Sequence, residues 1–242
     1  CGAAVASSAK GWEALKWSTG LWPKLVKFMI ISPIVGFIVG AIMMGLLYML
    51  FAQSTPSRMN RVFGRLQILS AGFMGYSHGT NDAQKTMGII ALAMVASTKS
   101  GAFDRLPDWL GFLRLTSSEA GKFPIPDWVV IVCAFTMFAG TAAGGWRIIK
   151  TMGFGLANLR PVQGFAAEMS AATVIEVATR LGVPISTTHV LSSGIAGTMA
   201  ANASGLQSGT VRNILLAWVL TLPITIALGY LFFRGALMLG WG

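Results

Sequence analysis

The chain has 242 residues, of which 54% are hydrophobic and only 11% are charged. This composition excludes an ordinary soluble domain of that length and is typical of a multi-pass membrane protein. The formal net charge of +10 does not indicate nucleic-acid binding, because the basic residues are scattered singly through short connections.

The N-terminal part of the chain predicts an interfacial segment followed by a membrane span. Residues 1–9 resemble the tail of a membrane helix, and we take the chain to be a fragment of a longer protein. Residues 10–27 place three tryptophans among lysines, a composition that suits a membrane interface. Residues 28–51 are apolar and long enough to cross a bilayer. We expect the first complete span there.

A polar cluster interrupts the apolar run over residues 66–96. Three glycines between residues 72 and 79 weaken a continuous helix. Asn81 is followed three residues later by Gln84, which is the spacing of a capping box at a helix start. We therefore predict a broken membrane helix whose second half begins at Asn81 and points its positive end at an anion. A glycine-kinked helix that packs its polar groups on a neighbour is the structural alternative.

The rest of the chain predicts two further spans, over residues 128–144 and 211–233. Between them lie segments 164–180 and 184–203, which are rich in small residues and carry polar groups. Neither is suited to face lipid. They predict either a re-entrant hairpin or two interior helices.

A second polar motif, Pro-Ile-Ser-Thr-Thr-His, occupies residues 184–189. Proline suits the first turn of a helix and Ser186 suits its cap, so a helix is predicted to begin here. The hydroxyls can donate to phosphate-like oxygens or, together with carbonyls, accept a bare cation. The alternative is that they bond back to their own helix, as is common in membrane spans.

Ionisable groups inside apolar segments are candidates for a transport pathway. Asp82 can ligate sodium, carry a proton or pair with Lys85 one turn on. Glu168 and Glu176 share roughly one helix face. Each either lines the transport cavity or caps the backbone of a neighbouring helix. We favour a pathway role for Glu168.

The two histidines, His78 and His189, lie in the two polar motifs. We expect them to orient neighbouring groups or to handle protons. Two histidines alone do not complete a metal site, and the sequence offers no obvious further ligands for them. Cys1 and Cys133 form neither a metal-binding motif nor a disulfide framework. We therefore expect no metal site and no cofactor other than the transported ions.

The two ends of the chain show a weak internal similarity. Small residues, a polar stretch and a span containing proline occur in this order around Pro33 and again around Pro223. Inverted repeats are a recurring plan of secondary transporters. Residues 1–51 are accordingly interpreted as the end of a first repeat with a connecting span, and residues 52–242 as a second repeat with both motifs.

At these residues the chain resembles the PiT family of inorganic phosphate transporters. Residues 78–88 look like the family's second-half Asn-Asp signature, and residues 184–189 look like its second Ser/Thr-Thr-His signature. Residues 145–153 and 160–168 resemble the bacterial branch. The resemblance implies an all-α inverted-repeat transporter in the bacterial inner membrane. It further implies symport of inorganic phosphate with sodium or protons, a homodimer, and in the bacterial branch a neutral divalent-metal–phosphate complex as cargo.

The candidate site residues follow from the motifs and from this resemblance. The first-half copies of both motifs are absent, so we expect half of the site to come from an N-terminal half of the same protein, without which the chain should not transport. The predicted phosphate ligands are Thr80, Asn81, Asp82, Ser186, Thr187 and Thr188. The predicted coupling-ion or pathway residues are Asp82, Gln84, Lys85, His78, His189, Glu168, Ser192 and Ser193.

Two other functions remain open at this point. A passive anion channel would use the same polar motifs without coupling to an ion gradient. An intramembrane hydrolase would use a serine with His189 or His78, but no orienting acid and no oxyanion site are identifiable, so we expect no enzyme. The favoured prediction is that phosphate binds where the helix starts at Asn81 and Ser186 converge, held by amides and hydroxyls rather than by arginine.

Overall fold

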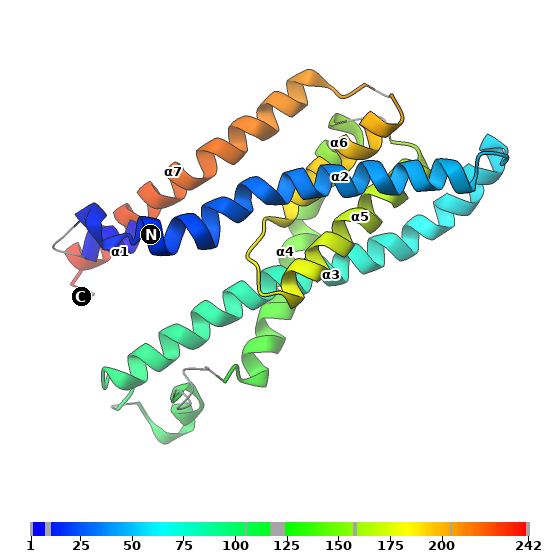
Figure 1. The fold of residues 1–242 in the computed structure, drawn as a ribbon. Coiled ribbons are helices and arrows are strands. Elements are labelled where there is room, and N and C mark those ends of the chain that lie inside the picture. Colours follow the sequence, from blue (N-terminus) through cyan, green and yellow to red (C-terminus); the bar gives the residue numbers. More distant parts are fainter. Residues whose placement is uncertain are drawn as a thin grey trace. The chain divides into compact units, whose positions relative to one another are not determined.

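A computed structural model describes residues 2–7, 11–104, 106–116, 124–156, 159–203 and 205–240. Every regular element in these ranges is a helix, which confirms the all-α prediction (Figure 1). The α-helices are α1 (Gly2–Ser7), α2 (Lys27–Leu50), α3 (Pro56–Lys99), α4 (Asp127–Lys150), α5 (Pro161–Arg180), α6 (Thr187–Ala201) and α7 (Ser208–Met238). The tighter or wider helical turns are η1 (Gly11–Ala14), η2 (Trp17–Val26), η3 (Asp108–Leu113) and η4 (Thr151–Gly155).

Among the described residues, three helical stretches are long and apolar enough to cross a membrane. They cover Trp17–Leu50, Asp127–Gly155 and Ser208–Met238, and they contain the three spans predicted from the sequence, apart from residue 51 at the end of the first. The tryptophan-rich segment before the first span is itself helical, because η2 continues directly into α2. The interfacial segment and the first span thus form one helical stretch.

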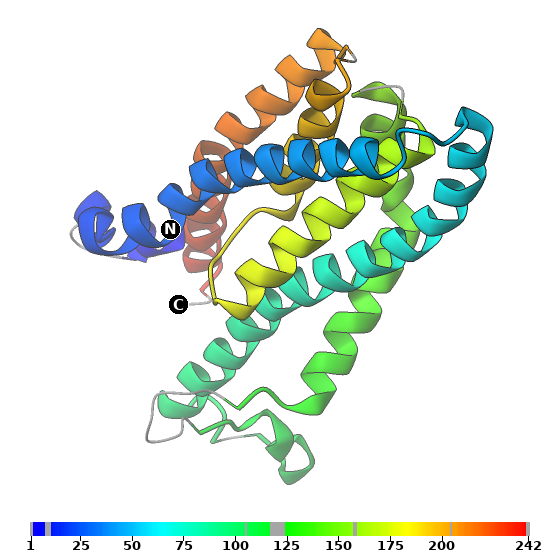
Figure 2. The same ribbon diagram turned by 45° about the vertical axis from the view of Figure 1, so that its right-hand side comes forward.

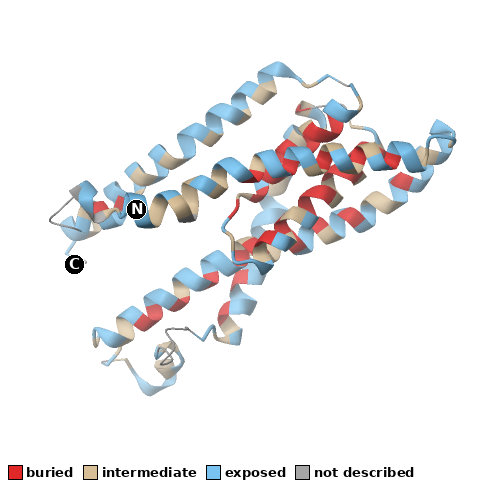
Figure 3. Cartoon of the chain, in the orientation of Figure 1, coloured by how far each residue is buried: buried red, intermediate tan, exposed pale blue. Residues whose placement is uncertain are grey.

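The chain forms two compact units, one made of residues 1–74 with 150–242 and the other of residues 75–149. In the first unit α2 packs on α5 and α6, while α1 packs on α7 (Figure 1). Buried residues concentrate on α5 and α6 (Figure 3). Segments 164–180 and 184–203 are therefore buried helices joined by residues 181–186, an arrangement that fits both a re-entrant hairpin and two interior helices.

Glycines let α2 and α6 approach until their backbones touch. A Cβ atom added to Gly40 would lie 3.0 Å from the Cα atom of Gly194, and one added to Gly36 would lie 2.8 Å from the carbonyl oxygen of Val190. Small residues four apart allow this close packing in membrane helices. The spacing of Gly36 and Gly40 was the signal for it, and sequence reasoning missed it.

The structure corrects the prediction of a broken helix at the first polar motif. Helix α3 runs without interruption through residues 72–88, so Asn81 lies inside it and not at a helix start. The only glycines with positive φ in the described residues are Gly101, Gly182 and Gly240. A glycine inside a helix costs about 1 kcal/mol, which continued main-chain hydrogen bonding outweighs. The positive helix end expected at Asn81 is therefore not there.

In the second unit the later turns of α3 pack against α4 (Figure 2). Ala83 and Met87 of α3 join Val129 and Cys133 of α4 in one buried apolar cluster. One side of α3 is thus anchored by apolar packing. Asp82 and Lys85 lie on another face of the same turns, whereas Thr80 and Gln84 line the side toward α4 with Ala83 and Met87.

Candidate functional site

Asp82 is the centre of a charged cluster on α3. Its Oδ2 atom lies 2.9 Å from Nε2 of His78, one turn earlier, and its Oδ1 atom lies 3.0 Å from Nζ of Lys85, one turn later. These spacings of four and three residues place the three side chains along one helix face. The ion pair between Asp82 and Lys85, which the sequence left as an alternative, is present.

A groove of about 610 Å³ lies beside this cluster, between α3 and α4 of the second unit. His78, Thr80 and Gln84 line it together with Thr141 of α4 and apolar neighbours. The Thr80 hydroxyl donates to the carbonyl oxygens of Tyr76 and Ser77, so it offers a ligand only its oxygen lone pairs. This part of the first motif is therefore better suited to accept a cation than to donate to an anion.

The second motif forms the helix start that the sequence predicted. Helix α6 begins directly after Ser186, whose Oγ atom accepts a hydrogen bond from the backbone N–H of His189 at 3.4 Å. Thr187 is buried and Thr188 is exposed. The start of a helix favours anions through its N–H groups and its dipole. Of the two helix starts predicted to bind an oxyanion, at Asn81 and at Ser186, the structure has the one at Ser186.

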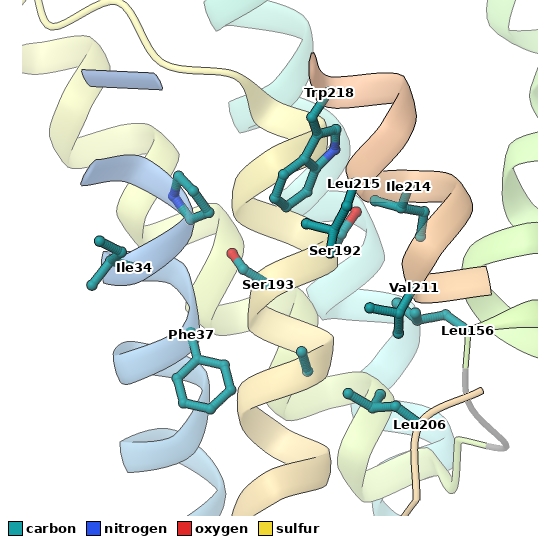
Figure 4. Close-up of a pocket in the computed structure, with 12 residues that line it drawn as sticks. Ile34, Phe37, Leu156, Ser192, Ser193, Leu206, Val211, Ile214, Leu215 and Trp218 are labelled. Carbon is teal, nitrogen blue, oxygen red and sulfur yellow. The ribbon is translucent and has the colours of Figure 1, made fainter. Parts of the chain in front are cut away.

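Ser192 and Ser193 lie one to two turns further along α6. Ser192 Oγ donates to the carbonyl of Thr188 at 2.7 Å, and Ser193 Oγ donates to the carbonyl of His189 at 2.7 Å. Both line a cavity of about 320 Å³ between α2, α6 and α7 whose other walls are apolar (Figure 4). Bonding back to their own helix is thus what these hydroxyls do here, and their pathway role stays a prediction.

His189 is buried against Trp218 of α7, with ring centroids 4.1 Å apart. The imidazole also hydrogen-bonds the main chain of Met29 on α2, while its Nδ1 atom is buried without a partner among the described residues. His189 therefore ties α6 to both α2 and α7. The orienting or proton-handling role of His189 stays a prediction, and no feature of the sequence pointed to Trp218 as its partner.

Glu168 on α5 is held by two side chains of α3 that sequence reasoning missed. Ser70 donates its hydroxyl to Oε2 of Glu168, and Gln67 hydrogen-bonds the same carboxylate. Polar residues three apart in an apolar run, as Gln67 and Ser70 are, were the available signal. Glu176 instead pairs with Arg180 of its own helix, at 2.8 Å.

Removal of the donors to Glu168 should destabilise the first unit. We expect the Gln67→Leu/Ser70→Ala variant to lose about 2 kcal/mol of unfolding free energy, because a half-buried carboxylate loses its hydrogen bonds. Thermal unfolding of the complete protein in detergent measures the loss. Adding Glu168→Gln should recover part of it, because the neutral amide costs less to leave unsolvated. Equal losses with and without Glu168→Gln would contradict this role of the pair.

The two motifs lie in different compact units, since Asp82 belongs to residues 75–149 and Ser186 to the other unit. Their convergence on one ligand stays a prediction. Within the described residues no group of three or more His, Cys, Asp and Glu side chains gathers as metal ligands. In the second unit, His78, Asp82 and Lys85 form a cluster that suits a cation. In the first unit, a helix begins after Ser186.

An all-helical chain with helices long and apolar enough to cross a membrane belongs to the class of α-helical membrane proteins. The sequence profile of the Phosphate transporter family matches residues 1–229, and the chain belongs to this family. The family consists of transporters, so the chain is not an enzyme and the hydrolase alternative is dropped. The resemblance noted in the sequence is thereby confirmed, and the protein is an integral membrane protein.

Named relatives support the assignment. A "Probable low-affinity inorganic phosphate transporter" of Bacillus subtilis (strain 168) is 38% identical over 229 residues, which are 94% of this chain and 62% of the relative. A protein of the same description from Rhizobium meliloti (strain 1021) is 37% identical over 211 residues, 86% of this chain and 58% of the relative. The chain thus spans about three-fifths of the length of these curated relatives.

A solved structure titled "The sodium-dependent phosphate transporter" has a similar fold, with a TM-score of 0.74. The match covers 97% of this chain and 70% of that one. At 20% sequence identity the likeness concerns the fold alone. It confirms that the helices of this chain are arranged as in a membrane transporter.

Proposed function

We propose that the protein containing this chain is a symporter that moves inorganic phosphate across a membrane, driven by a sodium or proton gradient. The observation that carries the proposal is the family match over residues 1–229, together with the names of the relatives. The charged cluster at Asp82 supports it further, since ionisable groups in apolar helices mark ion pathways.

The geometry suits the two motifs to different ligands. The first motif supplies a carboxylate and acceptor oxygens, which suit the coupling ion. The second motif supplies the start of α6 and its hydroxyls, which suit phosphate oxygens. Asn81, which is buried inside α3, can contribute its side-chain amide to phosphate but not free main-chain N–H groups.

Gradient-driven uptake tests the proposal. The complete protein is reconstituted in liposomes, and uptake of radiolabelled phosphate is followed with a sodium gradient, with a proton gradient and with neither. A symporter accumulates phosphate above the external concentration in at least one gradient, with saturable rates. Flux that only equalises the two sides would favour a passive anion channel, which is the second candidate.

Competition by other oxyanions tests the nature of the phosphate site. Arsenate is expected to inhibit uptake about as strongly as unlabelled phosphate, because it shares the shape and charge of phosphate. If the site uses a carboxylate as acceptor for a phosphate proton, sulfate should inhibit poorly at neutral pH, because it lacks that proton. Equal inhibition by sulfate and arsenate would contradict a carboxylate in this role.

The remaining sequence-based expectations are part of the same proposal. They are an N-terminal half of the same protein that completes the binding site, a homodimer, the bacterial inner membrane as location, and a division into repeats at residues 51 and 52. They also include cargo in the form of a neutral divalent-metal–phosphate complex and the absence of any resident cofactor. Omitting divalent metal from the uptake buffer distinguishes free phosphate from such a complex.

A further inference from the structure

Both carboxylate oxygens of Asp82 are already engaged by its own helix. Oδ2 contacts His78 at 2.9 Å and Oδ1 contacts the ammonium of Lys85 at 3.0 Å. Each oxygen keeps a further lone pair, but a coupling cation bound there would lie close to the Lys85 ammonium and be repelled by it. The ammonium of Lys85 therefore stands where such a cation would bind.

The ammonium of lysine and a monovalent metal ion are alike in what they offer a carboxylate. Each is a compact single positive charge, and the lysine ammonium is carried on a flexible four-carbon stem. The Lys85 side chain is 46% exposed, so it can swing away without unpacking α3.

We propose that Lys85 is a resident counter-cation of Asp82, and that the coupling cation binds by displacing its ammonium. The inference rests on the symport function proposed above. It adds that Lys85 neutralises the Asp82 carboxylate when no coupling cation is bound. With the site empty, Lys85 balances the charge of a partly exposed carboxylate. With the ion bound, the ammonium is released from the carboxylate, and its charge is then available to an anion.

The proposal makes Lys85 a competitor of the cation. A neutral side chain of similar length at residue 85 removes the contact to Oδ1, while His78 still contacts Oδ2. The incoming cation then neither displaces an ammonium nor is repelled by one. The half-saturating sodium concentration of Lys85→Met should therefore fall about fivefold, as expected for loss of a partly exposed ion pair.

Sodium titration of the purified complete protein tests the competition. Sodium chloride replaces choline chloride at constant ionic strength, while thermal unfolding and tryptophan fluorescence are followed. Lys99→Met, at the end of the same helix, is the matched control for loss of one lysine charge and should leave the sodium response unchanged. Asp82→Asn/Lys85→Met should lose the response, because the carboxylate is gone.

The outcomes separate this inference from the symport proposal. A fivefold gain in apparent sodium affinity for Lys85→Met supports the displacement even if no gradient drives uptake, in which case symport alone fails. Unchanged or weaker sodium binding by Lys85→Met overturns the displacement, whether or not uptake occurs. Loss of phosphate binding with an unchanged sodium response would likewise overturn it and assign Lys85 to the anion.

Discussion

Asp82→Asn is expected to lower gradient-driven phosphate uptake at least about 100-fold. Losing a charged ligand of the coupling cation costs about 3 kcal/mol, and each 1.4 kcal/mol or so is a factor of ten. Asparagine keeps the size of the side chain but carries no charge, so neither His78 nor Lys85 nor a coupling cation finds its carboxylate. Initial rates of radiolabelled uptake in proteoliposomes measure the loss.

The control for Asp82→Asn is Asp82→Glu, which keeps the charge and adds one methylene. It should retain more uptake than the amide variant. Both variants should unfold within a few degrees of the natural protein, because ion pairs between neighbouring turns are worth only about 0.5 kcal/mol each. Uptake by Asp82→Asn at the natural rate would remove Asp82 from the ion pathway.

Gly197→Ala is expected to destabilise the first unit by about 3 kcal/mol, through overpacking of two touching helices. A Cβ atom at Gly197 would lie 2.9 Å from the carbonyl carbon of Phe37 and 3.0 Å from the backbone nitrogen of Ala41. Both neighbours are main-chain atoms of α2, which cannot rotate away as a side chain can. The two helices must separate. Thermal unfolding of the complete protein in detergent reports the effect.

Gly45→Ala is the matched control for Gly197→Ala. Gly45 lies in α2, and no atom lies within 4 Å of a Cβ added there. The added methyl should therefore be neutral, or stabilise the helix by up to about 1 kcal/mol through its higher helix propensity. A Gly197→Ala protein that unfolds at the same temperature as Gly45→Ala would show that α2 and α6 do not pack as closely as described.

The sequence was sufficient to predict those elements that depend on residues close together in the chain. Apolar runs of about 20 residues predicted the spans later found within Trp17–Leu50, Asp127–Gly155 and Ser208–Met238. Proline followed by a capping serine predicted the start of α6 at Ser186. The ion pair of Asp82 with Lys85 also follows from a spacing of three residues on one helix.

The same local reasoning failed at residues 72–88, where glycines and an apparent capping box predicted a helix start. Each of these signals is worth about 1 kcal/mol, and a helix already formed on both sides adds its hydrogen bonds cooperatively. The capping spacing of Asn81 and Gln84 therefore occurs inside α3 without ending it. The weak preferences of glycine and of a capping residue do not end a helix whose neighbouring turns are already formed.

The sequence by itself determined the class of this protein, its membrane spans, its family signatures and the spacing that lets Asp82 pair with Lys85, because these depend on composition or on residues within two turns of one another. Only the tertiary structure decided that Ser70 and Gln67 hold Glu168, that His189 stacks on Trp218, and that the glycines of α2 meet α6. These contacts join residues far apart in the chain. Their pairing depends on which helix faces meet, and no spacing along the chain encodes that.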